Sequence, residues 1–120
     1  MTGFLASPVE VVERSGTTAV ARVVVAADDP VFAGHFPGLP ILPGVGVVEF
    51  AHRAASATAS GAPRLAAVES TRFLRPTFPG ATLTVHLTWD DAGSRCAAVV
   101  RDADGVVARV KLRYEPGGGA

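Results

Sequence analysis

The alternation of hydrophobic and polar residues predicts two strands, one helix, and then three or four further strands. It is strictest where Leu83, Val85 and Leu87 alternate with threonine and histidine, so that one face of this strand should be buried and the other polar. β-Branched residues and turn signals such as Ser15-Gly16 and Asp104-Gly105 mark the other strands. The predicted strands span residues 8–14, 17–26, 65–74, 82–89, 95–101 and 106–114.

Between the second and third of these strands the pattern changes twice. Residues 28–44 are so rich in glycine and proline that regular structure is not expected there. Pro43 then suits the first turn of a helix, where its missing N–H would have no partner. Apolar residues continue from that point, and Gly61 follows as a stop signal, so we predict a helix from Pro43 to about Ser60. Its first half is apolar on nearly every side, which indicates a buried helix.

This order of elements is typical of the α+β class. A curved antiparallel β-sheet wrapped around one central α-helix accounts for it with one hydrophobic core. A chain of 120 residues is expected to form a single domain, here residues 1–116, followed by a disordered glycine-rich tail at 117–120. The core would be small for this length, and a dimer that shares surface is therefore plausible.

The composition of the chain limits the kinds of partner and cofactor that it could bind. Lys plus Arg and Asp plus Glu both number 11, so no net field attracts nucleic acid or a membrane surface. The single Cys96 excludes an intrachain disulfide and a cysteine-based zinc site, and its apolar strand indicates a buried filler. The apolar runs are too short for a membrane span and residues 1–7 do not resemble a signal peptide, so we expect a cytoplasmic protein.

Glu49 is the one charged residue between Ile41 and Ala51, in the second turn of the predicted helix. A buried carboxylate is costly and usually has a raised pKa, and a carboxyl group that keeps its proton near neutral pH can act as a general acid. The alternative is a structural ion pair with Arg53 at i+4. These residues leave both readings open.

His35 lies in the glycine- and proline-rich loop ahead of this helix, and a loop histidine is a candidate base. The helix start at Gly44 adds free N–H groups, the positive end of the helix dipole, and no side chain to hinder a ligand. A base, an acid and an oxyanion site suit the elimination of water from a 3-hydroxyacyl thioester, a reaction that needs no metal or organic cofactor.

Two segments resemble the signature of the FabZ-type 3-hydroxyacyl-acyl-carrier-protein dehydratases. The first contains GHFPG at 34–38, PILPGV at 40–45 and then Glu49, which is fourteen positions after His35 as in that family. The second is RFLRPTFPGATL at 72–83, which resembles the strand and Pro-Gly turn of the family. The likeness in layout covers nearly the whole chain.

The resemblance implies a hotdog fold and a hydro-lyase that forms a trans-2-enoyl thioester on acyl carrier protein. The substrate would be held through its phosphopantetheine thioester, by a homodimer, with a heterodimer or a trimer of dimers as alternatives. The active sites would lie at the dimer interface, with His35 from one subunit, Glu49 from the other, and the N–H of Gly44 polarising the thioester carbonyl. The residues implied for the acyl tunnel are Phe36, Val45 and Val48.

The chain departs from the family pattern in two places. Phe50 to Arg53 (FAHR) replaces the common AMAQ, and Ala81 stands where an acidic residue is usual. Arg53 would either hold Glu49 ionised or pair outward. We take this divergence to indicate a specialised enzyme of polyketide or aryl-polyene assembly. His52 and His86 are interpreted as a partly exposed and a solvated residue without a role.

Two other functions remain open. One is a hotdog thioesterase acting on acyl carrier protein or coenzyme A, and the other is a non-catalytic partner subunit of a heterodimeric dehydratase. An acidic carrier protein would be met by an arginine cluster, for which Arg64, Arg72 and Arg75 are the candidates, although they equally fit ordinary charges at a strand edge.

Overall fold

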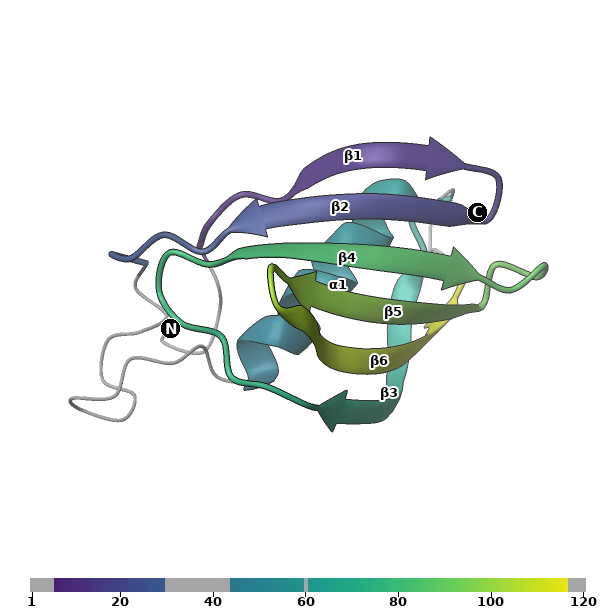
Figure 1. The fold of residues 1–120 in the computed structure, drawn as a ribbon. Helices are drawn as coiled ribbons and strands as arrows, with labels where there is room; N and C mark the ends of the chain where they lie inside the picture. The colour runs from purple at the N-terminus through teal and green to yellow at the C-terminus, as the bar shows by residue number, and fades with distance from the viewer. Residues whose placement is uncertain (1–5, 30–43, 60, 117–120) are drawn as a thin grey trace.

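The computed structural model describes residues 6–29, 44–59 and 61–116 (Figure 1). Within them lie one α-helix and six strands, whose bounds agree with the predicted strands to within two residues. Most of the predicted loop 28–44, the predicted helix ends at Pro43 and Ser60, and the predicted tail 117–120 lie outside the described residues. The elements are β1 (Glu10–Ser15), β2 (Thr18–Val24), α1 (Gly44–Thr58), β3 (Arg64–Phe73), β4 (Thr82–Trp89), β5 (Arg95–Asp102) and β6 (Gly105–Glu115).

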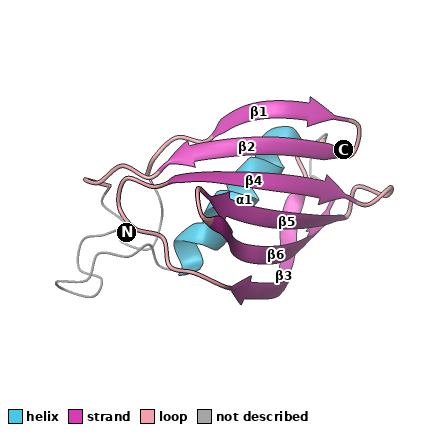
Figure 2. Ribbon diagram, viewed as in Figure 1, coloured by secondary structure: helices cyan, strands magenta, loops and turns pink. Residues whose placement is uncertain are grey.

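These strands form one antiparallel sheet that curves around α1, which confirms the predicted α+β architecture (Figures 1 and 2). The strand order is β1-β2-β4-β5-β6-β3. Only β4, β5 and β6 therefore form a simple meander within the described sheet, and β3 pairs with β6 at the far edge. The chain returns from β3 to the middle of the sheet because Gly80 and Ala81 hydrogen-bond to Val25 just beyond β2, at 2.7 and 2.8 Å.

The core lies between α1 and the concave face of the sheet. Leu83, Val85 and Leu87 of β4 are buried while His86 is exposed, which confirms the predicted alternation. On the helix, small buried residues such as Ala51 and Ala54 let α1 approach the sheet closely around the ring of Phe50. The first turn differs from the prediction, because Val45 is 51% exposed and the helix is thus not buried on every side.

A buried carboxylate fastens the segment before β1 to the end of β2. Asp29 is 5% exposed and accepts hydrogen bonds from the N–H of Ser7 at 2.9 Å, from the Ser7 hydroxyl at 2.6 Å, and from the N–H of Ala6 at 3.1 Å. The sequence predicted only that this position lies in a segment without regular structure. Such charge-assisted bonds are among the stronger ones in proteins.

We expect Asp29→Asn to lower the free energy of unfolding by about 1–3 kcal/mol, since an amide cannot accept all of these bonds. Asp28→Asn is the matched control, because it removes the same charge from an exposed neighbour. Urea denaturation of both variants measures the difference. Equal midpoints for the two would contradict a structural role for the Asp29 carboxylate.

Candidate active site

The first turn of α1 lies directly beneath an aromatic ring from the end of β3. A Cβ atom placed on Gly44 would be 3.0 Å from Cζ of Phe73 and 3.2 Å from its Cε2. Glycine therefore lets the Phe73 ring pack on the start of the helix. The sequence had left this space for a ligand, and the structure places a side chain of the same chain there.

The predicted catalytic and tunnel residues that the structure describes lie along this helix. Glu49 is partly buried, about 7.5 Å along the axis from Gly44 at the usual rise of an α-helix. Val48 packs against the core, whereas Val45 points away from it into the exposed part of the first turn. His35 and Phe36 lie outside the described residues.

His52 follows Glu49 by about one helical turn and faces Tyr114 of the sheet. Its Nδ1 is 2.8 Å from the hydroxyl of Tyr114, and the two rings stack at 5.8 Å between centroids. Trp89 lies against Tyr114 at 5.2 Å. Burial lowers the pKa of His52 below its ordinary 6.5, more strongly than the charge of Glu49 raises it. The sequence had assigned His52 no role, and the structure shows it as a polar contact between helix and sheet.

This lowered pKa predicts a pH dependence of stability. Unfolded chains bind a proton at His52 more readily than folded ones, so stability present above pH 6.5 is lost as the pH falls below that value. In urea denaturation, the difference in unfolding free energy between the wild type and His52→Gln should thus decrease as the pH is lowered from 7.5 to 5.

The control for this measurement is His86→Gln, which removes a histidine from the exposed face of β4. A His52→Gln curve that runs parallel to the wild-type curve over the whole range would contradict the assignment.

Arg53, which belongs to the first departure from the family pattern, reaches the segment before β1. Its Nη2 donates a hydrogen bond of 3.0 Å to the carbonyl of Ser7. The same short segment is held by Asp29. Arg53 thus helps to fasten the chain ahead of β1 to the middle of α1.

The segment that follows β3 is held rigidly beside the helix start. The N–H groups of Leu74 and Arg75 donate to the carbonyl of Val107 at 2.8 and 3.3 Å. The Arg75 guanidinium lies 2.6 Å from the carboxylate of Asp102 and 3.4 Å from that of Asp104. Burial raises the pKa of Asp102, but hydrogen bonds from Arg75 and from backbone N–H groups outweigh it and lower that pKa overall.

A cavity of about 340 Å³ separates this segment from α1. Gly44 and Val47 line it from the helix, and residues 73–77 line it from the other side. Sequence reasoning missed Phe73 and Thr77 as site residues, although both fall in the second family-like segment.

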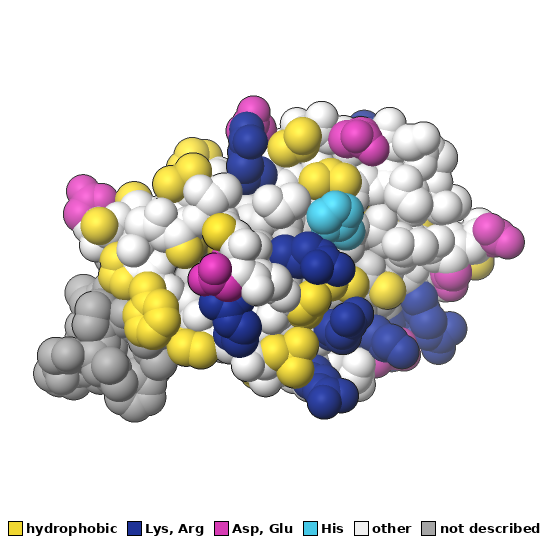
Figure 3. Space-filling view, in the orientation of Figure 1, with side chains coloured by type: hydrophobic (Ala, Val, Ile, Leu, Met, Phe, Trp, Pro, Cys, Tyr) yellow, Lys and Arg dark blue, Asp and Glu magenta, His cyan; other side chains and the backbone are white. Residues whose placement is uncertain are grey.

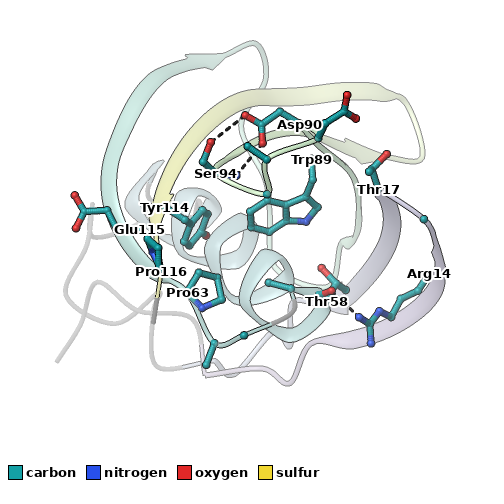
Figure 4. Close-up of a pocket in the computed structure, with 17 residues that line it drawn as sticks. Arg14, Thr17, Thr58, Pro63, Trp89, Asp90, Ser94, Tyr114, Glu115 and Pro116 are labelled. Atoms are coloured by element: carbon teal, nitrogen blue, oxygen red, sulfur yellow. Dashed lines mark hydrogen bonds between the residues drawn. The ribbon is translucent and has the colours of Figure 1, made fainter. Parts of the chain in front are cut away.

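A larger cavity of about 900 Å³ lies at the other end of α1 (Figure 4). Trp89 and Tyr114 form its aromatic wall. The Arg14 guanidinium caps the C-terminus of α1 by donating a hydrogen bond of 2.8 Å to the carbonyl of Thr58. Thr58, which lines this cavity, lies about 20 Å from Gly44 along the axis of α1 at the usual rise of an α-helix. We therefore place the candidate active site at the smaller cavity, because the carboxylate and the helix N-terminus both lie toward that end.

Other chemistry is sparse in the described part of the chain. Cys96 is buried as expected, and burial raises the pKa of its thiol to about 12, so it is not a nucleophile at neutral pH. No group of three or more His, Cys, Asp and Glu residues that could hold a metal occurs among residues 6–29, 44–59 and 61–116. Across the same residues, no helix is long and apolar enough to cross a membrane.

The curved sheet wrapped around one helix places the protein in the hotdog-fold class. Solved structures agree: one from the dehydratase heterocomplex ApeI:P of Xenorhabdus doucetiae superposes with a TM-score of 0.78 at 22% identity, over 88% of this chain and 93% of that one. The E. coli PaaI protein from the phenylacetic acid degradation operon gives 0.69 at 19% identity, over 93% and 81%.

The sequence places it more narrowly. Residues 11–111 match the family model described as ApeI-like, ApeI dehydratase, and the chain belongs to this family. A 3-hydroxyacyl-[acyl-carrier-protein] dehydratase FabZ of Polynucleobacter necessarius is 37% identical over 82% of this chain and 71% of its own length. The FabZ of Roseiflexus castenholzii is 34% identical over 62% of this chain, which spans 57% of that relative. The resemblance seen in the sequence is thereby confirmed.

Proposed function

We propose that the protein is a hydro-lyase that removes water from a 3-hydroxyacyl thioester on acyl carrier protein and forms the trans-2-enoyl thioester. The observation that carries this proposal is the placement of Glu49 on α1 of a chain that belongs to the ApeI-like dehydratase family, close to the helix N-terminus at Gly44. Relatives named as FabZ dehydratases support the same reaction.

The proposed chemistry divides the work among three groups. His35 takes the proton from the carbon next to the thioester carbonyl, and the electron pair moves onto the carbonyl oxygen. The N–H groups at the start of α1, with the positive end of the helix dipole, stabilise that oxygen. Glu49 then protonates the departing 3-hydroxyl, which leaves as water.

A rapid test of this function follows the reverse reaction. Hydration of a trans-2-enoyl pantetheine thioester removes the absorbance of its conjugated double bond. A thioesterase would instead release free thiol.

We also propose that β3 forms the subunit interface of a dimer. Leu65, Val68 and Phe73 are 36–49% exposed, although they pair in register with the buried Tyr114, Leu112 and Ala108 of β6. Their apolar side chains thus lie on the concave face of the sheet, where α1 leaves them partly exposed. An edge strand with exposed apolar side chains tends to associate with another chain, and a second subunit would cover these side chains.

A carrier protein would be received on the outer face of the sheet. Arg72 stands directly opposite Arg109 on neighbouring strands, and Lys111 and Arg101 lie close by. All four are exposed and none forms an ion pair with another described residue, and basic side chains gather over β5, β6 and β3 (Figure 3). By contrast, Arg95 stands opposite Arg113, and Glu69 neutralises both, at 3.1 and 3.4 Å.

Like charges placed opposite each other destabilise a sheet, so an unrelieved pair is better explained by an acidic partner. Of the three arginines that the sequence singled out, Arg72 belongs to this basic face. Arg75 is engaged by Asp102, and Arg64 lies at the far end of β3, 3.5 Å from Glu115.

We expect Arg109→Glu to raise the KM for a carrier-bound substrate about 10-fold and to leave its kcat unchanged, because the charge reversal weakens encounter with an acidic carrier. Turnover of the same acyl group on free pantetheine should be unaffected. Arg64→Glu is the matched control. An equal effect of both variants, or an equal effect on both substrates, would contradict this docking surface.

A further inference from the structure

Thr77 has a buried hydroxyl group without a hydrogen-bond partner in the part of the chain that the structure describes. The residue is 2% exposed, and among the described residues its Oγ1 has no hydrogen-bond partner. Buried hydroxyl groups nearly always have a partner, since an unsatisfied one opposes folding. The packing of the described residues thus gives no reason for a threonine rather than a valine at this position.

The position of Thr77 relates this hydroxyl to the start of α1. Thr77 lines the cavity of about 340 Å³ together with Gly44 and Val47. The first N–H groups of α1 have no partner within the helix, and the helix dipole makes this end positive. Thr77 thus lines the cavity from the sheet side, and the first turn of α1 lines it from the helix side.

The surroundings keep Thr77 in place. Upstream, the hydrogen bonds of Leu74 and Arg75 to Val107 and the ion pair with Asp102 hold the chain to β6 and β5. Downstream, the N–H of Gly80 donates to the carbonyl of Val25 at 2.7 Å, and the positive φ of Gly80 allows the turn that follows. A donor held from both sides needs little reorganisation when charge develops near it.

We propose that the Thr77 hydroxyl donates a hydrogen bond to the thioester oxygen of the substrate, as a second donor beside the N–H groups of α1. This inference rests on the proposed dehydratase function. When the proton next to the carbonyl is removed, the electron pair moves to that oxygen, and the Thr77 hydrogen bond strengthens. When the pair returns, the bond to the 3-hydroxyl breaks and water leaves. Thr77 keeps its own proton throughout.

The test compares Thr77→Val, which has the same shape without the hydroxyl, with Thr77→Ser, which keeps it. We expect Thr77→Val to lower kcat about 100-fold, as expected for the loss of one oxyanion donor, and Thr77→Ser to retain most of the activity. The unfolding midpoint of Thr77→Val should not fall, because the hydroxyl has no hydrogen bond to another described residue that the change would remove. Thr88→Val on the exposed face of β4 is the control.

Wild-type kcat in Thr77→Val would overturn the proposal, and so would a loss of activity that parallels a lower unfolding midpoint. A second measurement separates this inference from the dehydratase assignment. A 3-hydroxyacyl pantetheine amide, with nitrogen in place of the thioester sulfur, is titrated while the threonine methyl resonances are followed by NMR. A shift of Thr77 but not of Thr88, with binding about fivefold weaker in Thr77→Val, supports the donor even if the wild type does not dehydrate. No shift at Thr77 overturns it.

Discussion

His35→Ala and Glu49→Gln should each lower the turnover of a 3-hydroxyacyl carrier substrate by about 1,000-fold, as expected for the loss of a general base or a general acid. Glu49→Gln keeps the size of the side chain, whereas His35→Ala removes the imidazole ring, and we expect the dimer to persist in both variants. Glu13→Gln is the matched control, because it removes a carboxylate from the exposed edge strand β1. Activity within a few fold of the wild type in either variant would remove that residue from the proposed mechanism.

Mixing the two inactive variants tests whether the site is shared between subunits. If His35 and Glu49 of one site come from different chains, each mixed dimer contains one site with both residues intact. Random exchange makes half of the dimers mixed, so about a quarter of the wild-type activity should return. No recovery after confirmed subunit exchange would place both residues of each site in the same chain.

Val68→Glu should convert the dimer to a monomer and abolish most of the activity. Val68 is 43% exposed on the concave side of β3, so a charge there costs the isolated chain little but would be buried without a partner in the proposed interface. Analytical ultracentrifugation measures the association, and the carrier assay measures turnover.

The control is Val24→Glu, which places the same charge at a valine that is 56% exposed on β2, at the other side of the sheet. A stable dimer of Val68→Glu would refute the β3 interface. A purified wild-type chain that is monomeric would direct the search to a second, different chain as the partner.

The elements of the fold could be predicted from the sequence, whereas the strand order could not. The predicted bounds of β4 match the observed ones, because Leu83, Val85 and Leu87 face the core and their neighbours face solvent. β3 is exposed on both faces along almost its whole length, so its residue pattern contains no trace of its neighbour. Its place beside β6 depends on contacts between residues far apart in the chain, such as Gly80 with Val25.

The site shows the same division. Glu49 stood out because it is the one charge in an apolar stretch, and Gly44 because it begins the helix. Phe73 and Thr77 are ordinary residues for a strand end and a turn, and they gain meaning only when β3 delivers them to the start of α1. The basic face was only partly visible, since Arg72 and Arg109 meet through strand register rather than through sequence proximity.

The most direct measurement is the intact mass of an acyl carrier protein loaded with a 3-hydroxyacyl group, before and after incubation with the purified protein. The proposed function predicts the loss of one water from the loaded carrier, with the acyl group still attached. Unloaded carrier together with free 3-hydroxy acid would contradict it and identify a thioesterase, and an unchanged mass across several acyl groups would contradict catalysis by this chain on its own.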